Sequence, residues 1–156
     1  MTLTARLTIE DDLRALADLL NHTIQLGGTT AHEDIMTVAE LKAAYFDKPA
    51  LVHTVLDGNT PIGFQAVFAV SGGLSIGSFT DQRNPARSAG SVMFTATKAA
   101  AIACGFLWID AKIRADNIPG LAYYNKMGFE DLKVDTGVPL KDGTPMDRIT
   151  KRLFLG

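Results

Sequence analysis

A run of small residues lies where a strand is expected to end and an alanine-rich helix to begin, from Arg87 to Val92. The first amide groups of a helix have no acceptor within the helix, and together with the helix dipole they favour phosphate binding. Small side chains at Ser88, Ala89, Gly90 and Ser91 leave the backbone open to such a group. The run therefore predicts a pyrophosphate site, although by itself it is equally compatible with an ordinary turn into a surface helix.

A second segment combines an asparagine, a short helix and an aromatic residue ahead of a glycine. Asn117 precedes Ile118 and Pro119, a sequence typical of a helix N-cap followed by proline in the first turn. Tyr124 precedes Gly128, which lies where a helix C-terminus favours a positive φ angle. This tyrosine is either a proton donor in a functional site or an aromatic residue of the core.

Together the two segments resemble the signatures of the GNAT superfamily of N-acetyltransferases. The first signature is Gln or Arg, two free positions, Gly, one free position, and Gly or Ala. Arg87 and Gly90 match it, Ser91 fills the free position, and Val92 departs from the final small residue.

The second signature places an asparagine before a short helix that contains Tyr, three free positions, Gly and Phe. Asn117, Tyr124, Gly128 and Phe129 match it without a gap. The order of the expected elements agrees with the family along nearly the whole chain. The resemblance implies the GNAT fold, in which a mixed, mainly antiparallel sheet is flanked by helices and strands four and five diverge.

The resemblance also implies acetyl-CoA as the cosubstrate and assigns roles to individual residues. The pyrophosphate lies on the backbone of Arg87 to Val92, and the pantetheine arm lies in the gap between strands four and five. The residues of strand four expected beside this arm are Phe79, Thr80 and Asp81. Asn117 is expected to face the cofactor, and Tyr124 to act beside the thioester sulfur as a general acid for the departing thiolate.

The N-terminal half, from Asn21 to Glu33 and on to Thr37, resembles the phosphinothricin and methionine sulfoximine acetyltransferase branch of the family. In that branch this stretch lines the acceptor site, so Glu33 is a candidate to orient the substrate amine. The alternative is that His32 and Glu33 belong to a solvated loop.

The sequence lacks two features of that branch. Gly77 and Ser78 stand near the usual position of a strand-four glutamate, so removal of the amine proton falls to water, His22, His32 or Glu33. The long arginine-containing hairpin before strand four is replaced by a tight turn at residues 71–73. No arginine occurs between Arg14 and Arg83, which predicts poor activity on phosphinothricin and methionine sulfoximine, because arginine is the usual partner of a carboxylate.

The elements that must position these residues follow from apolar periodicity, caps and turn residues. The expected strands are Leu3–Ile9, Ala50–Leu56, Pro61–Val70, Leu74–Thr80, Phe106–Ile113, Phe129–Val138 and Met146–Phe154. The expected helices carry the stripe from Leu13 to Ile24, then Val38–Phe46, Ser88–Ala103 and Ile118–Lys126. Thr8 and Thr37 are predicted as N-caps, the latter in a capping box with Glu40.

Composition narrows the class of protein. A chain of 156 residues suits one domain, here residues 1–156. Fifteen basic and 17 acidic residues, without long runs of one sign, argue against nucleic acid as a partner. The longest uncharged stretch, residues 58–80, is interrupted by glycines and a proline and so argues against a membrane span. One cysteine and three histidines without zinc-type spacing argue against a metal site. With no secretory signal at the start of the chain, a cytoplasmic location is expected.

The sequence therefore predicts transfer of an acetyl group from acetyl-CoA to a primary amine of a small molecule, by direct attack in a ternary complex. A homodimer is compatible with this prediction. The alternative is a GNAT-shaped module that binds acyl-CoA or regulates another protein and has lost catalysis.

Overall fold

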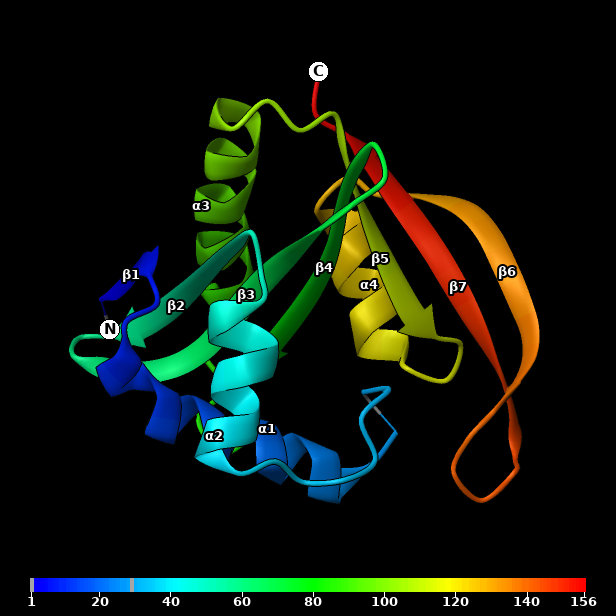
Figure 1. The fold of residues 1–156 in the computed structure, drawn as a ribbon, viewed down its shortest axis with the longest axis horizontal. Helices are drawn as coiled ribbons and strands as arrows, with labels where there is room; N and C mark the ends of the chain where they lie inside the picture. The colour runs from blue at the N-terminus through cyan, green and yellow to red at the C-terminus, as the bar shows by residue number, and fades with distance from the viewer. Residues whose placement is uncertain (1, 29) are drawn as a thin grey trace.

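The computed structural model describes residues 2–28 and 30–156. Its strands are β1 (Leu3–Leu7), β2 (Leu51–Asp57), β3 (Thr60–Val70), β4 (Gly73–Thr80), β5 (Trp108–Arg114), β6 (Glu130–Pro139) and β7 (Pro145–Phe154) (Figure 1). Its helices are α1 (Leu13–Leu26), α2 (Val38–Lys42), α3 (Ala89–Ala103) and α4 (Ile118–Lys126), with a 3-10 turn η1 (Glu10–Asp12) and a π-helical turn η2 (Ala43–Asp47). Among the described helices, none has the length and apolar character needed to cross a bilayer.

The seven strands form one sheet in the order β1-β2-β3-β4-β5-β7-β6. All neighbouring pairs are antiparallel except β4 and β5, which run parallel. The predicted fold class, a mixed and mainly antiparallel sheet flanked by helices, is confirmed, and so is the predicted order of strands and helices.

Local capping signals were correct for α2 and wrong for α1. Thr37 accepts from the Glu40 amide (3.1 Å) and its own amide donates to the Glu40 carboxylate (3.0 Å), which confirms the capping box. The hydroxyl of Thr8, predicted to be an N-cap, instead bonds the Thr54 hydroxyl at 2.8 Å. The tertiary contact to β2 satisfies this side chain, and η1 precedes the helix.

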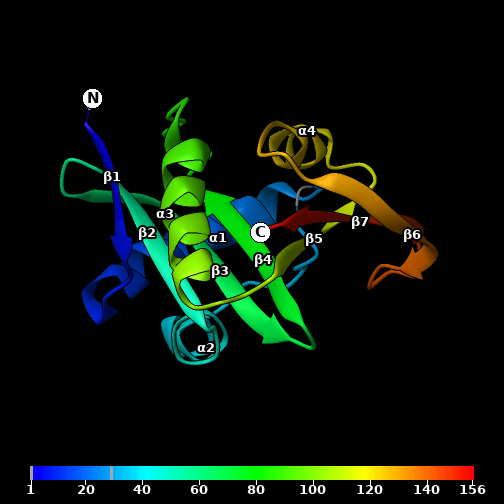
Figure 2. The same cartoon turned by 90° about the horizontal axis from the view of Figure 1, so that it is seen from above.

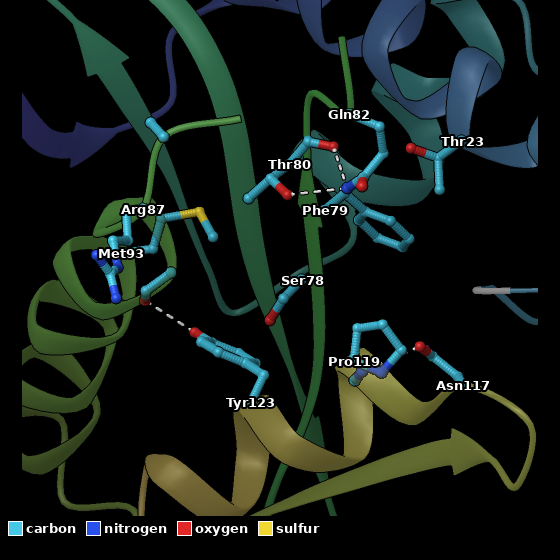
Figure 3. Close-up of a pocket in the computed structure, with 13 residues that line it drawn as sticks. Thr23, Ser78, Phe79, Thr80, Gln82, Arg87, Met93, Asn117, Pro119 and Tyr123 are labelled. Atoms are coloured by element: carbon cyan, nitrogen blue, oxygen red, sulfur yellow. Dashed lines mark hydrogen bonds between the residues drawn. The ribbon is translucent and has the colours of Figure 1, made fainter. Parts of the chain in front are cut away.

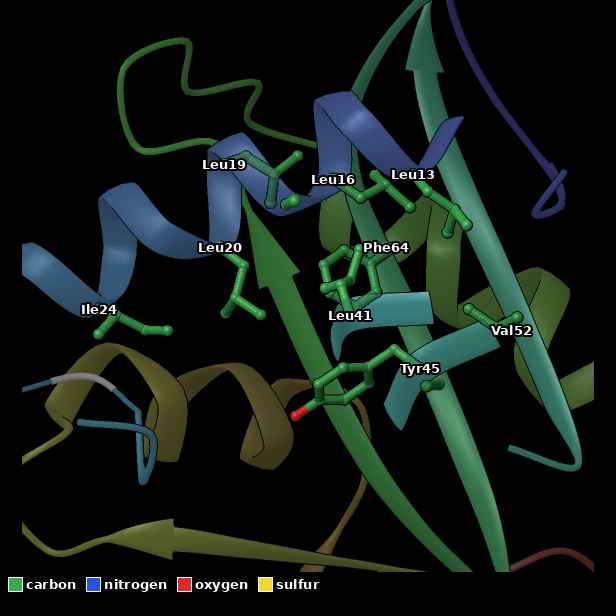
Figure 4. Close-up of a cluster of buried hydrophobic side chains, with 11 residues drawn as sticks. Leu13, Leu16, Leu19, Leu20, Ile24, Leu41, Tyr45, Val52 and Phe64 are labelled. Carbon is green, nitrogen blue, oxygen red and sulfur yellow. The ribbon is translucent and has the colours of Figure 1, made fainter. Parts of the chain in front are cut away.

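Two apolar layers cover the sheet, one on each face. α1, α2 and η2 pack on one face around Leu16, Leu41 and Phe64 (Figure 4). α3 and α4 pack on the other face in clusters that include Val67, Met93 and Tyr124. Successive side chains of a strand point to opposite faces, so β3, at the centre of both layers, is apolar on both sides.

β4 and β5 pair over only three residues before they separate. The register joins Leu74 to Ile109 and ends with Ile76 opposite Ala111. Beyond this point the two strands diverge, with α4 beside the opening (Figures 1 and 2). The predicted divergence of strands four and five is therefore confirmed, and it leaves one edge of β4 without a neighbouring strand.

The groups on this free edge can be identified from the β3 pairing. The Asp81 amide, just after β4, donates to the Ile62 carbonyl of β3 at 2.8 Å. Backbone groups of an antiparallel strand alternate between its two edges. The backbone N–H and C=O groups of Ser78 and Thr80 therefore face the gap.

Gly73 fixes the closed end of the gap. The ring of Trp108, the first residue of β5, lies against the Gly73 backbone, so that a Cβ at position 73 would overlap the indole. The Arg152 guanidinium also stacks on this ring, 3.8 Å from its centroid, and is held by the Asp110 carboxylate at 2.6 and 2.9 Å. Backbone, indole and ion pair together join β4, β5 and β7.

We expect Gly73→Ala to lower the free energy of unfolding by about 1–3 kcal/mol, because the methyl group displaces the Trp108 ring from a packed site. Gly77→Ala is the matched control, since a Cβ there meets the Phe79 ring at 3.5 Å, an ordinary contact. Urea unfolding measures both. Equal losses in the two variants would contradict the role given to the Trp108 contact.

Candidate functional site

A cavity of about 310 Å³ lies between the free edge of β4, the start of α3 and α4 (Figure 3). We call it the α3 cavity. Its wall includes Thr80 from β4, Arg87 and Gly90 from the start of α3, and Pro119 and Tyr123 from α4. It therefore occupies the gap that the divergence of β4 and β5 opens.

The first turn of α3 presents free donors beside this cavity. The Ala89 amide donates to the Ala86 carbonyl in the preceding loop and the Val92 amide to the Ser88 carbonyl, each at 3.0 Å. Within residues 2–28 and 30–156, the amides of Ser88, Gly90 and Ser91 have no acceptor. The first turn contains no acidic residue, and the Ser88 side chain makes no capping bond. Three of the five amides from Ser88 to Val92, at the start of a 15-residue helix, are therefore unpaired among the described residues, and unpaired amides at a helix N-terminus favour an anion.

A buried polar chain connects β3, β4, α4 and α3. Gln65 Nε2 donates to Ser78 Oγ (2.8 Å) and to Tyr123 Oη (3.1 Å). Tyr123 Oη in turn donates to the Gly90 carbonyl at 2.8 Å, and Ser78 Oγ bonds Tyr124 Oη at 2.8 Å. These hydrogen bonds fix the positions of both tyrosine hydroxyls.

Both tyrosines are held in the neutral form. Burial raises the pKa of Tyr123 to about 12, against the opposing effect of its hydrogen bonds to Gln65 and Ser78. Burial also raises the pKa of Tyr124 well above its usual value, and the hydrogen bond to Ser78 offsets only part of this effect. Both side chains are therefore hydrogen-bond donors near neutral pH and not phenolates.

A second cavity, of about 190 Å³, lies between the loop that precedes α2 and strands β4, β5 and β7. We call it the β5 cavity. Tyr124, His32 and Tyr45 line it. The two cavities share three wall residues, Ser78, Phe79 and Asn117, so they meet at the middle of the outer half of β4.

Asn117 occupies this junction because it caps α4. Its Oδ1 accepts from the Gly120 amide at 3.0 Å, and Pro119 follows in the first turn. The N-cap predicted from sequence is confirmed, and the same residue lines both cavities.

Of the candidate bases, His32 lines the β5 cavity. Its Nε2 forms a short hydrogen bond with the Tyr45 hydroxyl, which points out of the α1–α2 cluster (Figure 4). Burial lowers the pKa of the His32 imidazole below its usual 6.5 and raises the pKa of Tyr45 to about 12. Near neutral pH, His32 is therefore an uncharged imidazole that can accept a proton. His22 lines neither cavity.

Glu33 does not lie where the resemblance implied. Its carboxylate accepts from the Lys141 amide at 2.8 Å, on the exposed loop between β6 and β7, and it lines neither cavity. The adjacent Asp34 forms an ion pair with the Lys141 ammonium at 2.6 Å. Lys141 thus holds both acidic side chains outside the two cavities, at the loop between β6 and β7.

Two arginines reach the β5 cavity from strands that the sequence predicted but did not connect with the site. Arg114 on β5 and Arg148 on β7 both line it, together with Lys112. The expectation of a site without arginine rested on residues 15–82 alone. Strand pairing supplies the guanidinium groups from the C-terminal half instead.

The other predicted cofactor residues divide into two groups. Phe79, Thr80, Arg87, Gly90 and Asn117 line the α3 cavity. Asp81, Ser88, Ala89, Ser91 and Val92 do not line it. The Asp81 carboxylate holds Arg83 at 2.9 Å, and the Val92 side chain packs against an apolar cluster on the sheet. The residues that the sequence analysis missed are Gln65, Tyr45, Tyr123, Arg114 and Arg148, and Ser78 was noted only as the replacement of an acid.

Comparisons with known proteins find matches to the fold of this chain but not to its sequence. No family model matches the chain, and no curated protein matches its sequence. Solved structures match it over its full length. An N-acetyltransferase from Staphylococcus aureus Mu50 is 17% identical, with a TM-score of 0.90 and full coverage of both chains.

Two further structures contain acetyl-CoA. A GNAT superfamily phosphinothricin acetyltransferase from Sinorhizobium meliloti is 20% identical, with a TM-score of 0.88 over 100% of this chain and 90% of that one. A putative acetyltransferase from Salmonella typhimurium is 15% identical, with a TM-score of 0.83 over 100% and 95% of the two chains. The chain therefore has the fold of the GNAT N-acetyltransferases.

Proposed function

We propose that this protein is an acetyl-CoA-dependent N-acetyltransferase that acetylates a primary amine of a small molecule by direct attack. The observation that carries the proposal is the meeting of two cavities at Ser78, whose hydroxyl bonds Tyr124: one cavity has a helix end with free amides and the other has a neutral imidazole. The acetyl-CoA complexes among the structural neighbours support the same assignment.

The residues of the α3 cavity fit acetyl-CoA. The free amides of Ser88, Gly90 and Ser91 would hold the pyrophosphate, with Arg87 adding positive charge. The backbone groups of Ser78 and Thr80 on the free edge of β4 would bond the amides of the pantetheine arm. Bound acetyl-CoA would supply the activated acyl group at the junction of the cavities.

His32 would accept the proton that the acceptor amine loses. Its lowered pKa keeps the ring neutral at pH 7, and it lines the β5 cavity, which we assign to the acceptor. In the tautomer with a proton on Nε2, that nitrogen donates to Tyr45 Oη and leaves Nδ1 free to receive the proton, directly or through water. Holding the amine and the acyl group side by side would supply most of the rate acceleration.

Tyr124 would stabilise the sulfur as negative charge develops on it. A thiol has a pKa of about 8.5, whereas burial raises the pKa of Tyr124 above its usual value of 10.0, so complete proton transfer to the thiolate is uphill. A hydrogen bond from Tyr124 Oη, with Ser78 Oγ donating to the same oxygen, gives the required stabilisation without it. This refines the general-acid role that the resemblance implied.

The assay that tests the function measures release of free CoA thiol from acetyl-CoA in the presence of a panel of primary amines. Amine-dependent thiol release with an acetylated product is expected. A binding or regulatory module would instead bind acetyl-CoA without accelerating thiol release by any amine, and this outcome would refute the proposal.

Ser91→Glu should weaken CoA binding at least tenfold, because the new carboxylate lies at the amides proposed for the pyrophosphate. The same charge complements the helix dipole, so thermal stability should be unchanged or slightly higher. Ala99→Glu is the matched control on an exposed position two turns along α3, about 12 Å away. Calorimetric titration with CoA measures both, and equal affinities in the two variants would exclude α3 as the phosphate site.

Tyr124→Phe should keep the fold and the affinity for CoA while lowering kcat by roughly ten- to a thousandfold, since it removes only the donor to the sulfur. Tyr123→Phe is the matched control, because the Tyr123 hydroxyl already donates to the Gly90 carbonyl. Its kcat should fall less than that of Tyr124→Phe. A kcat within about twofold of wild type for Tyr124→Phe would make this tyrosine a core residue.

His32→Gln should lower kcat by roughly a hundredfold or more, in the range found for general bases. In the wild type, kcat should fall on acidification below the lowered pKa of His32, hence at a pH under 6.5, as the ring gains a proton. This acidic limb of the pH profile of kcat should be absent from the variant, whereas ionisation of the acceptor amine affects both proteins alike. His22→Gln serves as the control and should retain both the rate and the limb.

A further inference from the structure

Arg148, in the wall of the β5 cavity, has neither a hydrogen-bond acceptor nor an ion-pair partner among the described residues. The side chain is half-buried, and its Nε is shielded from solvent. Within the described residues, this Nε has no acceptor and the guanidinium makes no ion pair. A buried donor without an acceptor costs about 1–3 kcal/mol, so an acceptor that the described residues do not supply would stabilise this position.

A second arginine lies directly opposite. Arg114 on β5 is the cross-strand neighbour of Arg148 on β7, and both line the cavity. Like charges in this relation destabilise a sheet. Arg114 is partly neutralised by Asp116, at 2.8 and 3.0 Å, and its remaining terminal nitrogen donates to the Thr30 carbonyl at 3.2 Å. Arg148 has no such compensation.

Nearby carboxylates do not relieve the charge. Asp135, the neighbour of Arg148 on β6, lies 3.8 Å from the Lys133 ammonium instead. Asp147 accepts from the Gly137 amide at 2.9 Å. The described wall of the β5 cavity contains Lys112, Arg114 and Arg148 and no acidic side chain. The cavity is therefore strongly positive on the side formed by β5 and β7.

We propose that the acceptor is an amino acid, whose carboxylate binds Arg148 beside Arg114 while its amine lies toward His32 and Tyr124. This proposal rests on the acetyltransferase function proposed above and names its substrate class. A planar guanidinium binds a carboxylate through two parallel hydrogen bonds, and one such pair would satisfy the Nε of Arg148.

The size of the cavity agrees with this class. At about 190 Å³ it is smaller than the roughly 300–1,000 Å³ of sites that take drug-sized ligands. A single amino acid fits such a volume better than a folded protein terminus or a peptide. The anion also lies across β4 from the free amides of α3, so it is distinct from the pyrophosphate of the cosubstrate.

The experiment compares amino acids with the amines that lack only the carboxylate. L-Alanine is paired with ethylamine, L-leucine with isopentylamine and L-phenylalanine with phenethylamine, and kcat/KM is measured by thiol release at saturating acetyl-CoA. In the wild type we expect the best amino acid to exceed its partner amine by roughly ten- to a hundredfold, the loss expected for a charge-assisted pair.

Arg148→Met should remove this preference, so that the ratio falls to about one while kcat/KM for the amine stays within about twofold. Arg148→Lys, which keeps the charge and loses the planar pair, should give an intermediate ratio. Lys133→Met is the matched control, because it removes one positive charge outside both cavities. Thermal unfolding without ligand should show Arg148→Met to be no less stable than wild type, since the variant removes a like-charge neighbour.

Equilibrium binding of the same pairs, followed by NMR titration of protein without acetyl-CoA, separates this proposal from the proposed function. Carboxylate-dependent binding that Arg148→Met abolishes supports the amino acid site even if no amine is acetylated. A wild-type preference for the amines, or a preference that persists in Arg148→Met, overturns it. A loss of CoA affinity in Arg148→Met without a change in the acceptor ratio assigns the guanidinium to the cosubstrate, and also overturns it.

Discussion

The separation of β4 from β5 after Ile76 is the constraint on which the site depends. If β4 and β5 stayed paired as far as Thr80, the backbone groups of β4 that now face the gap would bond to β5, and both cavities would close. The contact of Trp108 with Gly73 holds the strands together at one end. α4, capped by Asn117, lies beside the opening at the other end. A strand edge without a partner exposes hydrogen-bonding groups and is a liability for folding, and the pantetheine amides of the proposed cosubstrate would satisfy these groups.

The polar chain around Ser78 follows from that opening. Gln65 is fully buried, and its Oε1 has no partner among the described residues. A buried polar atom without a partner costs stability, so the side chain of Gln65 is not optimal for packing alone. It holds Ser78 and Tyr123 at fixed distances, and Ser78 in turn holds the Tyr124 hydroxyl. A donor aimed in advance at a developing charge requires no reorganisation during the reaction.

Local signals in the sequence predicted the elements well, and contacts between distant elements explain what they missed. The capping box at Thr37, the Asn117 cap and the small residues before α3 each act within one turn of chain, so they could be recognised without a structure. The position of Glu33 outside both cavities could not be foreseen, because its environment is set by Lys141, more than a hundred residues away in sequence. The hydroxyl of Ser78 acquired a role only through its contact with Tyr124 across the gap.

The two arginines illustrate the same limit most clearly. Arg114 and Arg148 are unremarkable as single residues in two strands, and only the register of β5 against β7 makes them neighbours. A one-residue shift of that register would send one of them to the opposite face of the sheet. The fold thus maintains a like-charge pair at some cost in stability, with one guanidinium compensated by Asp116 and the other left free. A protein that needed only a stable sheet at this place would have a carboxylate or an apolar residue opposite Arg114. The free guanidinium, in a cavity that also contains a neutral imidazole and a tyrosine donor, is best explained as a group whose partner arrives with the substrate.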